Sequence, residues 1–297
     1  MAITYDYYRI FYYVAKYQSF TRAANILMNN QPNITRAMNN LEKELDCRLF
    51  LRSNRGVTLT PEGRQLFSHV QIAYEQLLAG EYELASGKKL QSGYVSIGAS
   101  ETALHGLLLP VLRQFRLSYP GIHIQITNHS TPQAVSAVKN GLVELAVVTT
   151  PTGVSSPLQE VRLMEFQDIL IAGPHFSFLA EKSMHLRDLS LYPLICLGHE
   201  TKTYEFYNQL FMQHSLILQP DIETATTDQV LPMVKNDLGL GFLPSVFAEE
   251  ALKKGEVFAL KLKESIPTRY ICLVKDKSRP LSIASQELER LIRAASI

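Results

Sequence analysis

The sequence predicts an α/β protein with a helix-dominated head, a winged helix-turn-helix, over residues 1–60. Three observations predict this fold class. Apolar residues recur at helical spacing up to residue 45, two short strand-like segments joined by a turn follow, and strand-like and helix-like segments alternate from residue 93 onward. The chain has 297 residues, of which 46% are hydrophobic and 19% charged, which is enough for at least two globular domains.

Charge is unevenly distributed along the chain. Residues 1–60 contain eight Lys or Arg and four Asp or Glu, a net charge of +4, whereas the whole chain carries +1. The remainder is therefore mildly acidic. A basic head on an acidic body is typical of a nucleic-acid-binding module joined to a second domain, with chance asymmetry as the alternative.

The cysteines and the hydropathy pattern indicate a cytoplasmic protein. Cys47, Cys196 and Cys272 are widely spaced, which argues against a disulfide framework or a zinc cluster. The N-terminus does not have the pattern of a secretory signal, and no stretch reaches the roughly 18 uncharged apolar residues of a membrane span. We therefore expect no membrane partner, no metal and no cofactor.

The first 45 residues predict three helices. The first has its apolar face between residues 7 and 15, and the second is capped by Ser19 or Thr21. A polar break at residues 28–30 precedes Gln31-Pro32, where proline suits the first turn of a third helix ending near Leu45. Helix, short turn and helix form the geometry that places a recognition helix in the major groove of DNA.

The third helix has one polar face without lysine or glutamate. This face contains residues that can bond base edges, since Arg pairs with guanine and Asn or Gln with adenine. They are Gln31, Asn33, Thr35, Arg36, Asn39 and Asn40. The alternative is an ordinary solvated face, on which Glu and Lys would be more usual.

The next segment predicts a wing and the start of a long helix. Strands at 48–51 and 57–59 are joined by a Ser-Asn-Arg-Gly turn, so that Arg52 and Arg55 reach phosphates or the minor groove. Thr60 and Pro61 then cap and begin the helix.

At this point the sequence resembles the DNA-binding head of LysR-type transcriptional regulators. The resemblance rests on A-A-x-x-L-x-x-x-Q-P-x-I-T-R and on L-E-x-E-L-x-x-R-L-F-x-R-S-x-R-G-V-x-L-T-P-E-G. It implies sequence-specific binding to double-stranded DNA near promoters. Asn29, Asn30 and Leu51 depart from the family pattern. The predicted DNA-contacting residues are Thr21, Arg22, Gln31, Pro32, Asn33, Thr35, Arg36, Asn39, Arg52 and Arg55.

Residues 61–92 are expected to form a dimerisation helix and hinge. An apolar stripe that includes Leu66, Val70 and Leu77 runs along a helix of about 40 Å, at about 1.5 Å per residue. Pairing with a second copy would cover this stripe, and packing on the chain's own body is the alternative. The resemblance implies a homodimer, commonly a homotetramer, bound to two half-sites of a pseudo-palindrome.

Residues 93–297 predict an α/β domain with a largely parallel sheet, because strands and helices alternate. The predicted strands are 94–99, 122–127, 145–148, 169–172, 194–197, 222–225, 241–243 and 269–274, and helices are expected at 107–119, 132–140 and 282–295. The resemblance, which is looser here and rests on residues 234–244, implies an effector domain like a type 2 periplasmic binding protein. Its two lobes would be 93–164 with 266–297, and 165–265.

Hydroxyl-rich segments follow four of the predicted strands, where ligands of such sheets bind. Several of them begin helices, whose free N–H groups and dipole favour an anion such as a small carboxylate or an amino acid. The alternative for each one is simple helix capping. The predicted effector-binding residues are Ser100, Thr102, Thr149, His199, Thr201 and Thr227.

The sequence disfavours three rival functions. An enzyme is disfavoured because no G-x-S-x-G, P-loop or H-E-x-x-H motif is present. A transported-solute binding protein would not need the winged head. Redox sensing through Cys196 is disfavoured because Cys272 is far away in sequence.

Overall fold

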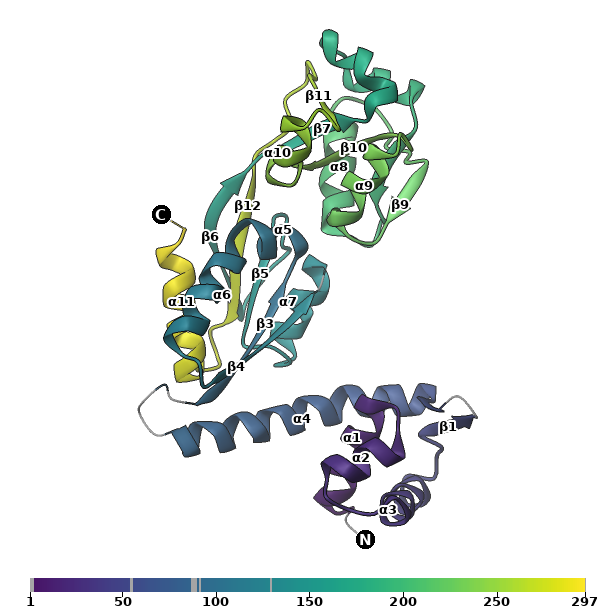
Figure 1. The fold of residues 1–297 in the computed structure, drawn as a ribbon, viewed down its shortest axis with the longest axis vertical. Coiled ribbons are helices and arrows are strands. Elements are labelled where there is room, and N and C mark those ends of the chain that lie inside the picture. Colours follow the sequence, from purple (N-terminus) through teal and green to yellow (C-terminus); the bar gives the residue numbers. More distant parts are fainter. Residues whose placement is uncertain (1–2, 54–55, 87–89, 91, 129, 297) are drawn as a thin grey trace. The chain divides into compact units, whose positions relative to one another are not determined.

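The structure, a computed structural model, describes residues 3–53, 56–86, 90, 92–128 and 130–296. The chain divides into two compact units, Met1–Ala85 and Ser86–Ile297. Figure 1 shows the helices of the first unit and the two sheets of the second. Among the described residues, no helix is both long and apolar enough to cross a membrane.

The first unit contains the three predicted helices, α1 (Tyr5–Tyr17), α2 (Phe20–Ile26) and α3 (Gln31–Glu44). Ser19, and not Thr21, caps α2 by accepting a hydrogen bond from the Arg22 N–H at 3.2 Å. Asn30 caps α3 by accepting from the Asn33 N–H at 2.9 Å. The three helices enclose a common apolar core.

The wing is an antiparallel hairpin of β1 (Phe50–Ser53) and β2 (Gly56–Leu59). The predicted first strand began too early, because the backbone at Arg48 and Leu49 is bonded elsewhere. Thr60 donates its hydroxyl to the Arg48 carbonyl at 2.7 Å and its N–H to the Leu49 carbonyl at 3.0 Å. Ser53 pairs with Gly56, so the turn is shorter than predicted.

The long helix α4 spans Pro61–Ser86, as its capping pattern predicted. Thr60 accepts from the Gly63 N–H at 2.9 Å and so satisfies one free donor of the first turn. Position 63 must be glycine, because a Cβ there would lie 2.2 Å from the Leu49 carbonyl oxygen. Val70 and Tyr74 are buried in the core of the first unit. The N-terminal half of α4 is therefore part of the head.

The second unit contains two five-stranded sheets. We call each sheet, together with the helices that pack on it, a lobe. Lobe I has the strand order β4-β3-β5-β12-β6 and lobe II the order β11-β7-β10-β8-β9. In lobe I the strands are β3 (Gly93–Ala99), β4 (Ile122–Asn128), β5 (Leu145–Thr149), β6 (Leu158–Phe166) and β12 (Arg269–Asp276). In lobe II they are β7 (Asp168–Ala172), β8 (Leu194–Leu197), β9 (Ile222–Thr224), β10 (Leu240–Pro244) and β11 (Phe258–Leu260).

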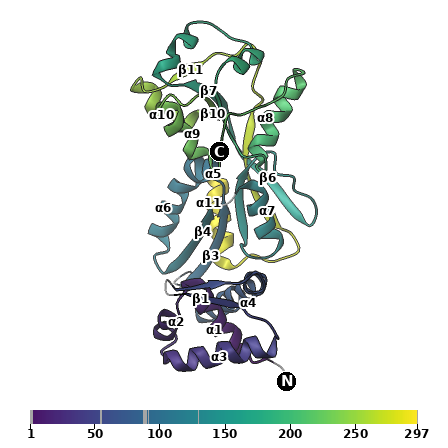
Figure 2. The ribbon, with the colours of Figure 1, turned by 90° about the vertical axis from the view of Figure 1, so that its right-hand side faces the viewer.

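Helices cover both faces of each sheet, so each lobe has two apolar layers. Figure 2 shows α6 and α7 on opposite sides of the lobe I sheet. The helices of lobe I are α5 (Glu101–Ala103), the π-helical turn η1 (Leu104–Leu108), α6 (Leu109–Ser118), α7 (Thr131–Lys139) and α11 (Ile283–Ala294). Those of lobe II are α8 (Lys202–Gln213), α9 (Val230–Lys235), α10 (Ser245–Lys253) and the 3₁₀ turns η2 (Pro174–Glu181), η3 (Leu186–Leu191) and η4 (Thr227–Gln229).

The prediction of a largely parallel sheet was wrong. In each sheet two strand pairs are parallel and two are antiparallel. The physical reason lies in the connections between the lobes. Gln167 alone separates β6 from β7, so the chain passes into lobe II without a crossover helix, which a parallel pair would require. On its return to lobe I the chain forms β12, which pairs antiparallel with β6. Strands β6 and β11 were also missed, since β6 mixes charged and apolar residues and β11 has three residues.

Candidate DNA-binding surface and ligand site

The polar face of α3 is exposed, whereas its apolar face is buried. Gln31, Pro32, Asn33, Arg36 and Asn39 are all exposed to solvent. On the opposite side Ile34, Met38 and Leu41 are buried in the core, as their spacing predicted. The helix therefore presents an arginine and several amides on one accessible surface.

Asn29 and Asn30, which depart from the family pattern, both organise the start of α3. Asn30 supplies the cap, as Ser or Thr would. The Asn29 side-chain oxygen accepts from the Asn30 N–H at 2.8 Å and from the Asn33 amide at 3.0 Å. The Asn33 amide is thus held at the helix start, so this departure orients a predicted base-contacting residue.

Thr35 differs from its neighbours on this helix. Its hydroxyl oxygen is buried and has no hydrogen-bond partner among the described residues. The side chain as a whole is half-buried. The free helix therefore does not offer this hydroxyl to DNA in the way that it offers the Arg36 side chain.

Glu42 ties α3 to the base of the wing. Its buried carboxylate accepts from the Leu49 N–H at 2.7 Å and from the Phe50 N–H at 3.1 Å, and it pairs with Arg48 at 3.2 Å. An ionised carboxylate is a strong acceptor for backbone donors. The base of the wing is consequently fixed relative to α3.

The other predicted DNA-contacting residues lie on α2 and on the wing. Thr21 and Arg22 are exposed, and the Arg22 guanidinium lies 4.9 Å from the centre of the Tyr17 ring. This cation–π contact orients the arginine at the surface. Arg52 pairs with Val57 through its backbone, while Arg55 and the Arg52 side chain lie outside the described residues.

Five of the six predicted effector-binding residues are buried hydroxyls of the second unit. They are Ser100, Thr102, Thr149, Thr201 and Thr227. Ser100 caps α5, Thr201 caps α8 and Thr227 begins η4, so three of them lie at helix starts. Helix α5 of lobe I contacts η4 of lobe II, which brings two of these starts together.

His199 is placed differently. Its side chain is 69% exposed and its ring nitrogen lies 3.3 Å from the Glu223 carboxylate. It also makes an edge contact with the Tyr204 ring. The structure thus separates this residue from the buried hydroxyls, although it precedes Thr201 by only two positions.

Sequence reasoning missed the buried ion pair of Arg269 and Asp168, whose side chains are 2% and 0% exposed. The Arg269 guanidinium bonds Asp168 at 3.0 Å, the Thr150 carbonyl at 2.9 Å and the hydroxyls of Thr149 and Thr203 at 3.2 and 3.1 Å. Thr149 and Thr150 belong to lobe I, whereas Asp168 and Thr203 belong to lobe II. Arg269 therefore bridges the lobes.

Aromatic side chains enclose this ion pair. The guanidinium lies 5.2 and 4.9 Å from the ring centres of Phe166 and Phe206. Tyr207 donates to Asp168 at 2.8 Å, and burial, together with the Asp168 carboxylate, raises the pKa of this phenol well above its ordinary value. One signal in the sequence could have located the pair: each of two apolar strands begins with a charged residue, Asp168 in β7 and Arg269 in β12, and the two charges are opposite.

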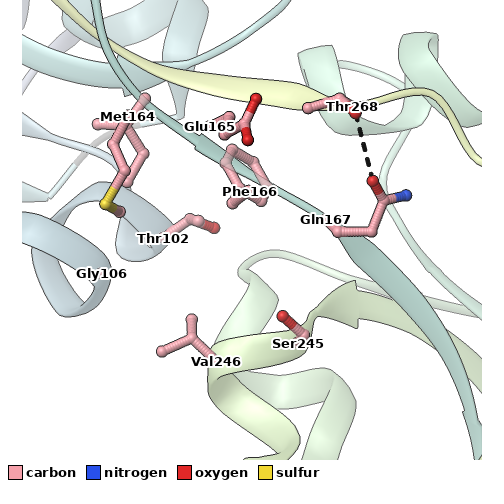
Figure 3. Close-up of a pocket in the computed structure, with 10 residues that line it drawn as sticks. Thr102, Gly106, Met164, Glu165, Phe166, Gln167, Ser245, Val246 and Thr268 are labelled. Atoms are coloured by element: carbon pink, nitrogen blue, oxygen red, sulfur yellow. Dashed lines mark hydrogen bonds between the residues drawn. The ribbon is translucent and has the colours of Figure 1, made fainter.

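A pocket of about 380 Å³ opens between the lobes (Figure 3). Lobe I contributes Thr102, Gly106 and Ile271, and lobe II contributes Ser245 and Val246. The strands that join the lobes complete the lining with Met164, Glu165, Phe166, Gln167 and Thr268. Of the predicted effector-binding residues, only Thr102 lines this pocket.

Two of the three cysteines lie in the interior, and Cys47 is half-buried. Cys196 and Cys272 are buried, and burial raises the pKa of each thiol to about 12. A thiol with so high a pKa is a poor nucleophile at neutral pH. The described residues contain no group of three His, Cys, Asp or Glu side chains that could hold a metal ion.

Both units match known protein families. Residues 5–64 match the family model of the bacterial regulatory helix-turn-helix protein, lysR family, and residues 88–296 match that of the LysR substrate binding domain. A probable RuBisCO transcriptional regulator from Gracilaria tenuistipitata var. liui is 27% identical over 301 residues, which cover 98% of this chain and 96% of the relative.

Two solved structures share the fold. The crystal structure of CbnR, a LysR family transcriptional regulator, has a TM-score of 0.74 at 17% identity and covers 99% of both chains. Full-length CbnR complexed with its target DNA has a TM-score of 0.73 at 17% identity and covers 98% of this chain and 99% of that one. The predicted fold class, a winged head with a two-lobed α/β domain, is confirmed.

Proposed function

Because this chain belongs to the LysR family of transcriptional regulators, we propose that the exposed face of α3 reads its DNA site while the wing contacts the backbone. The chain is a DNA-binding regulator with an effector-binding domain, and not an enzyme. The observation that carries the proposal is the amide- and arginine-bearing face of α3, which is accessible and rigidly capped. The proposed contacts are Thr21, Arg22, Gln31, Pro32, Asn33, Thr35, Arg36, Asn39, Arg52 and Arg55.

Arg36 provides the sharpest test of this proposal. If it reads a base, Arg36→Ala weakens binding to the cognate site by about 1–3 kcal/mol and relaxes specificity at one position. Arg187→Ala is a matched control, since it removes the same charge from a side chain that is 72% exposed in lobe II. Fluorescence anisotropy with cognate and single-base-changed duplexes measures the difference. Equal losses on every duplex would make Arg36 a phosphate contact.

We propose that the effector is a small carboxylate or an amino acid bound between the lobes. Supporting this are the hydroxyls at the starts of α5, α8 and η4 and the Arg269 cation beside Thr149. Helix starts favour a carboxylate, and Asp168 Oδ1, which lacks a partner among the described residues, would accept from an ammonium group. The proposed contacts are Ser100, Thr102, Thr149, Thr201 and Thr227; His199 has less support because it is exposed and paired.

Thr149→Val tests the effector proposal without removing a helix cap. The variant keeps the side-chain shape but loses the hydroxyl that Arg269 contacts. Small carboxylic and amino acids are compared with their methyl esters in a thermal-shift assay. We expect an acid, and not its ester, to stabilise the native chain, and the shift to shrink in Thr149→Val. Stabilisation by the ester alone would contradict the proposal.

We further propose that the chain forms a homodimer through α4, and a homotetramer in turn. Supporting this is an apolar groove of about 340 Å³ along α1 and α4, lined by residues that include Tyr5, Tyr8, Val70 and Leu77. Leu77 is 49% exposed in the single chain. A second α4 would cover this groove. Leu77→Glu is expected to lower the mass measured by sedimentation, whereas Leu191→Glu, on the surface of lobe II, is expected to leave it unchanged.

In the proposed mechanism the oligomer holds paired heads on a pseudo-palindromic site. Effector binding closes the lobes, changes the spacing of the heads and thereby alters the bend of the DNA. DNase footprinting and bend-angle measurements, with and without effector, test this step. An effector that binds but leaves both the footprint and the bend unchanged would contradict it.

A further inference from the structure

We propose that the interlobe pocket of Figure 3 is a second small-molecule site, and that it takes an uncharged or cationic amphipathic molecule and not an anion. This inference goes beyond the effector proposal, because the lining shares only Thr102 with the proposed effector contacts and the ligand class is not anionic. A pocket of about 380 Å³ lies within the range of small-molecule sites, roughly 300–1,000 Å³.

The pocket differs from the Arg269 centre in its lining. Its polar groups are the hydroxyls of Thr102, Ser245 and Thr268 and the amide of Gln167. None of these side chains is among the groups that Arg269 contacts. The Thr268 hydroxyl donates to Gln167 at 3.4 Å, and the Ser245 N–H donates to the Gln167 carbonyl at 3.0 Å. These bonds hold the polar wall in place.

Gly106 keeps the pocket open. It lies in the π-helical turn η1, a distortion that is frequent at functional sites. A Cβ at position 106 would lie 3.2 Å from Ile271 Cδ1 and 3.8 Å from Met164 Cε, which are both side chains of the lining. Any larger side chain at this position would therefore occupy the space that is now the pocket.

The charge of the lining selects the class of ligand. Glu165 is the charged member of the lining, which contains no lysine or arginine. His105, which precedes Gly106, is paired with Glu101 at 3.4 Å and contacts the Phe247 ring, so its imidazole is already engaged. An anion entering the pocket would lose hydration without gaining a cationic partner. An ammonium or hydroxyl group would find a carboxylate, an amide and hydroxyl acceptors.

The apolar part of the lining requires a carbon framework on the ligand. Met164, Phe166, Val246 and Ile271 supply this surface from both lobes and from the joining strands. Because Ile271 belongs to lobe I and Val246 to lobe II, an occupant would contact both lobes at once. Its binding would therefore favour the arrangement of lobes seen here and couple to the effector site.

Three probes of equal shape and different charge test the proposal on the full-length protein. They are cyclohexylamine, cyclohexanol and cyclohexanecarboxylate, measured by saturation-transfer NMR and titration calorimetry. We expect the amine and the alcohol to bind at least about tenfold more tightly than the carboxylate, because burying an unpaired carboxylate is costly. Carboxylate binding that equals or exceeds amine binding, or no binding of amine and alcohol, would overturn the proposal.

Two variants that fill the pocket locate the binding. Gly106→Val fills it from lobe I, and Val246→Trp fills it from lobe II at a position that is 45% exposed and so tolerates a larger side chain. Each is expected to weaken amine and alcohol binding at least about tenfold, since the pocket volume is lost. Leu117→Val, at a side chain 74% exposed on α6, is the control and should bind as the parent does.

Two further variants separate this site from the effector site. The Glu165 carboxylate should make the amine bind more tightly than the alcohol, and Glu165→Gln should remove this difference. Thr149→Val should leave the binding of both probes unchanged, whether or not it alters the response to acids. If both pocket-filling variants fold, as judged by circular dichroism, and still bind the probes as the parent does, the assignment of the pocket is wrong.

Discussion

At the scale of single residues, two buried carboxylates organise the two units. The Glu42 carboxylate accepts hydrogen bonds from the backbone N–H groups of Leu49 and Phe50. The Asp168 carboxylate forms an ion pair with Arg269 between the lobes. The sequence predicted the exposed face of α3, because local helical spacing determines which side chains are buried. It did not predict the Arg269–Asp168 pair, since its members are 101 positions apart and meet only when both lobes are assembled.

Removing Arg269 should be costly. Arg269→Met leaves the Asp168 carboxylate buried without a counterion, and we expect a loss of about 3–5 kcal/mol in the free energy of unfolding. Adding Asp168→Asn should recover part of this loss, because the uncompensated charge is gone. Urea unfolding of the single and double variants measures both effects. A single-variant loss below about 1 kcal/mol, or a double variant no more stable than the single, would contradict this account.

The native thiols should react slowly. Burial raises the pKa of the Cys196 and Cys272 thiols to about 12, so both remain protonated at physiological pH. Iodoacetamide labelling, followed by mass spectrometry, should leave both unmodified in the native chain and modify both after denaturation. Rapid native labelling of either would contradict the burial, and a lost effector response in Cys196→Ser would reopen the redox alternative.

At the scale of helices and strands, capping residues predicted the boundaries well. Ser19, one of two candidate caps, begins α2, and Thr60 begins α4 as predicted. The polar break expected before Gln31 contains Asn30, which caps α3. The sheets were less predictable. Strand β6 lacks clear alternation, and the antiparallel pairs depend on how the chain passes between the lobes. The pocket residues at 164–167 and 245–246 were missed for the same reason, since only the assembled lobes bring them together.

Gly63 packs the start of α4 closely against the Leu49 backbone at the base of the wing. Gly63→Ala forces the Leu49 backbone away, so we expect destabilisation by about 1–3 kcal/mol and weaker DNA binding. Gly80→Ala is the matched control in the same helix, where a Cβ meets nothing within 4 Å. It should be neutral or stabilising by about 0.5–1 kcal/mol. Thermal unfolding measures the stability of both variants, and fluorescence anisotropy measures their DNA affinity. Equal stability and equal affinity of the two variants would contradict the role assigned to the Leu49 contact.

At the scale of the whole molecule, the two units have separate tasks. The first unit presents a capped helix and a tethered wing, and the second holds two lobes joined by adjacent strands and by Arg269. Length, charge asymmetry and the alternation of elements predicted an α/β protein with a winged helix-turn-helix head, because each depends on composition and local order. Effector chemistry was not predictable to the same degree, since it depends on side chains that converge from both lobes.

The most direct test of the central claim is fluorescence-anisotropy binding to the DNA upstream of the protein's own gene, compared with scrambled DNA, across a salt series. We predict tighter binding to the cognate DNA, with affinity that falls steeply as salt rises, because released counterions contribute to phosphate contacts. Absence of binding to either DNA at low salt would contradict the claim that the α3 face and the wing form a DNA-binding surface.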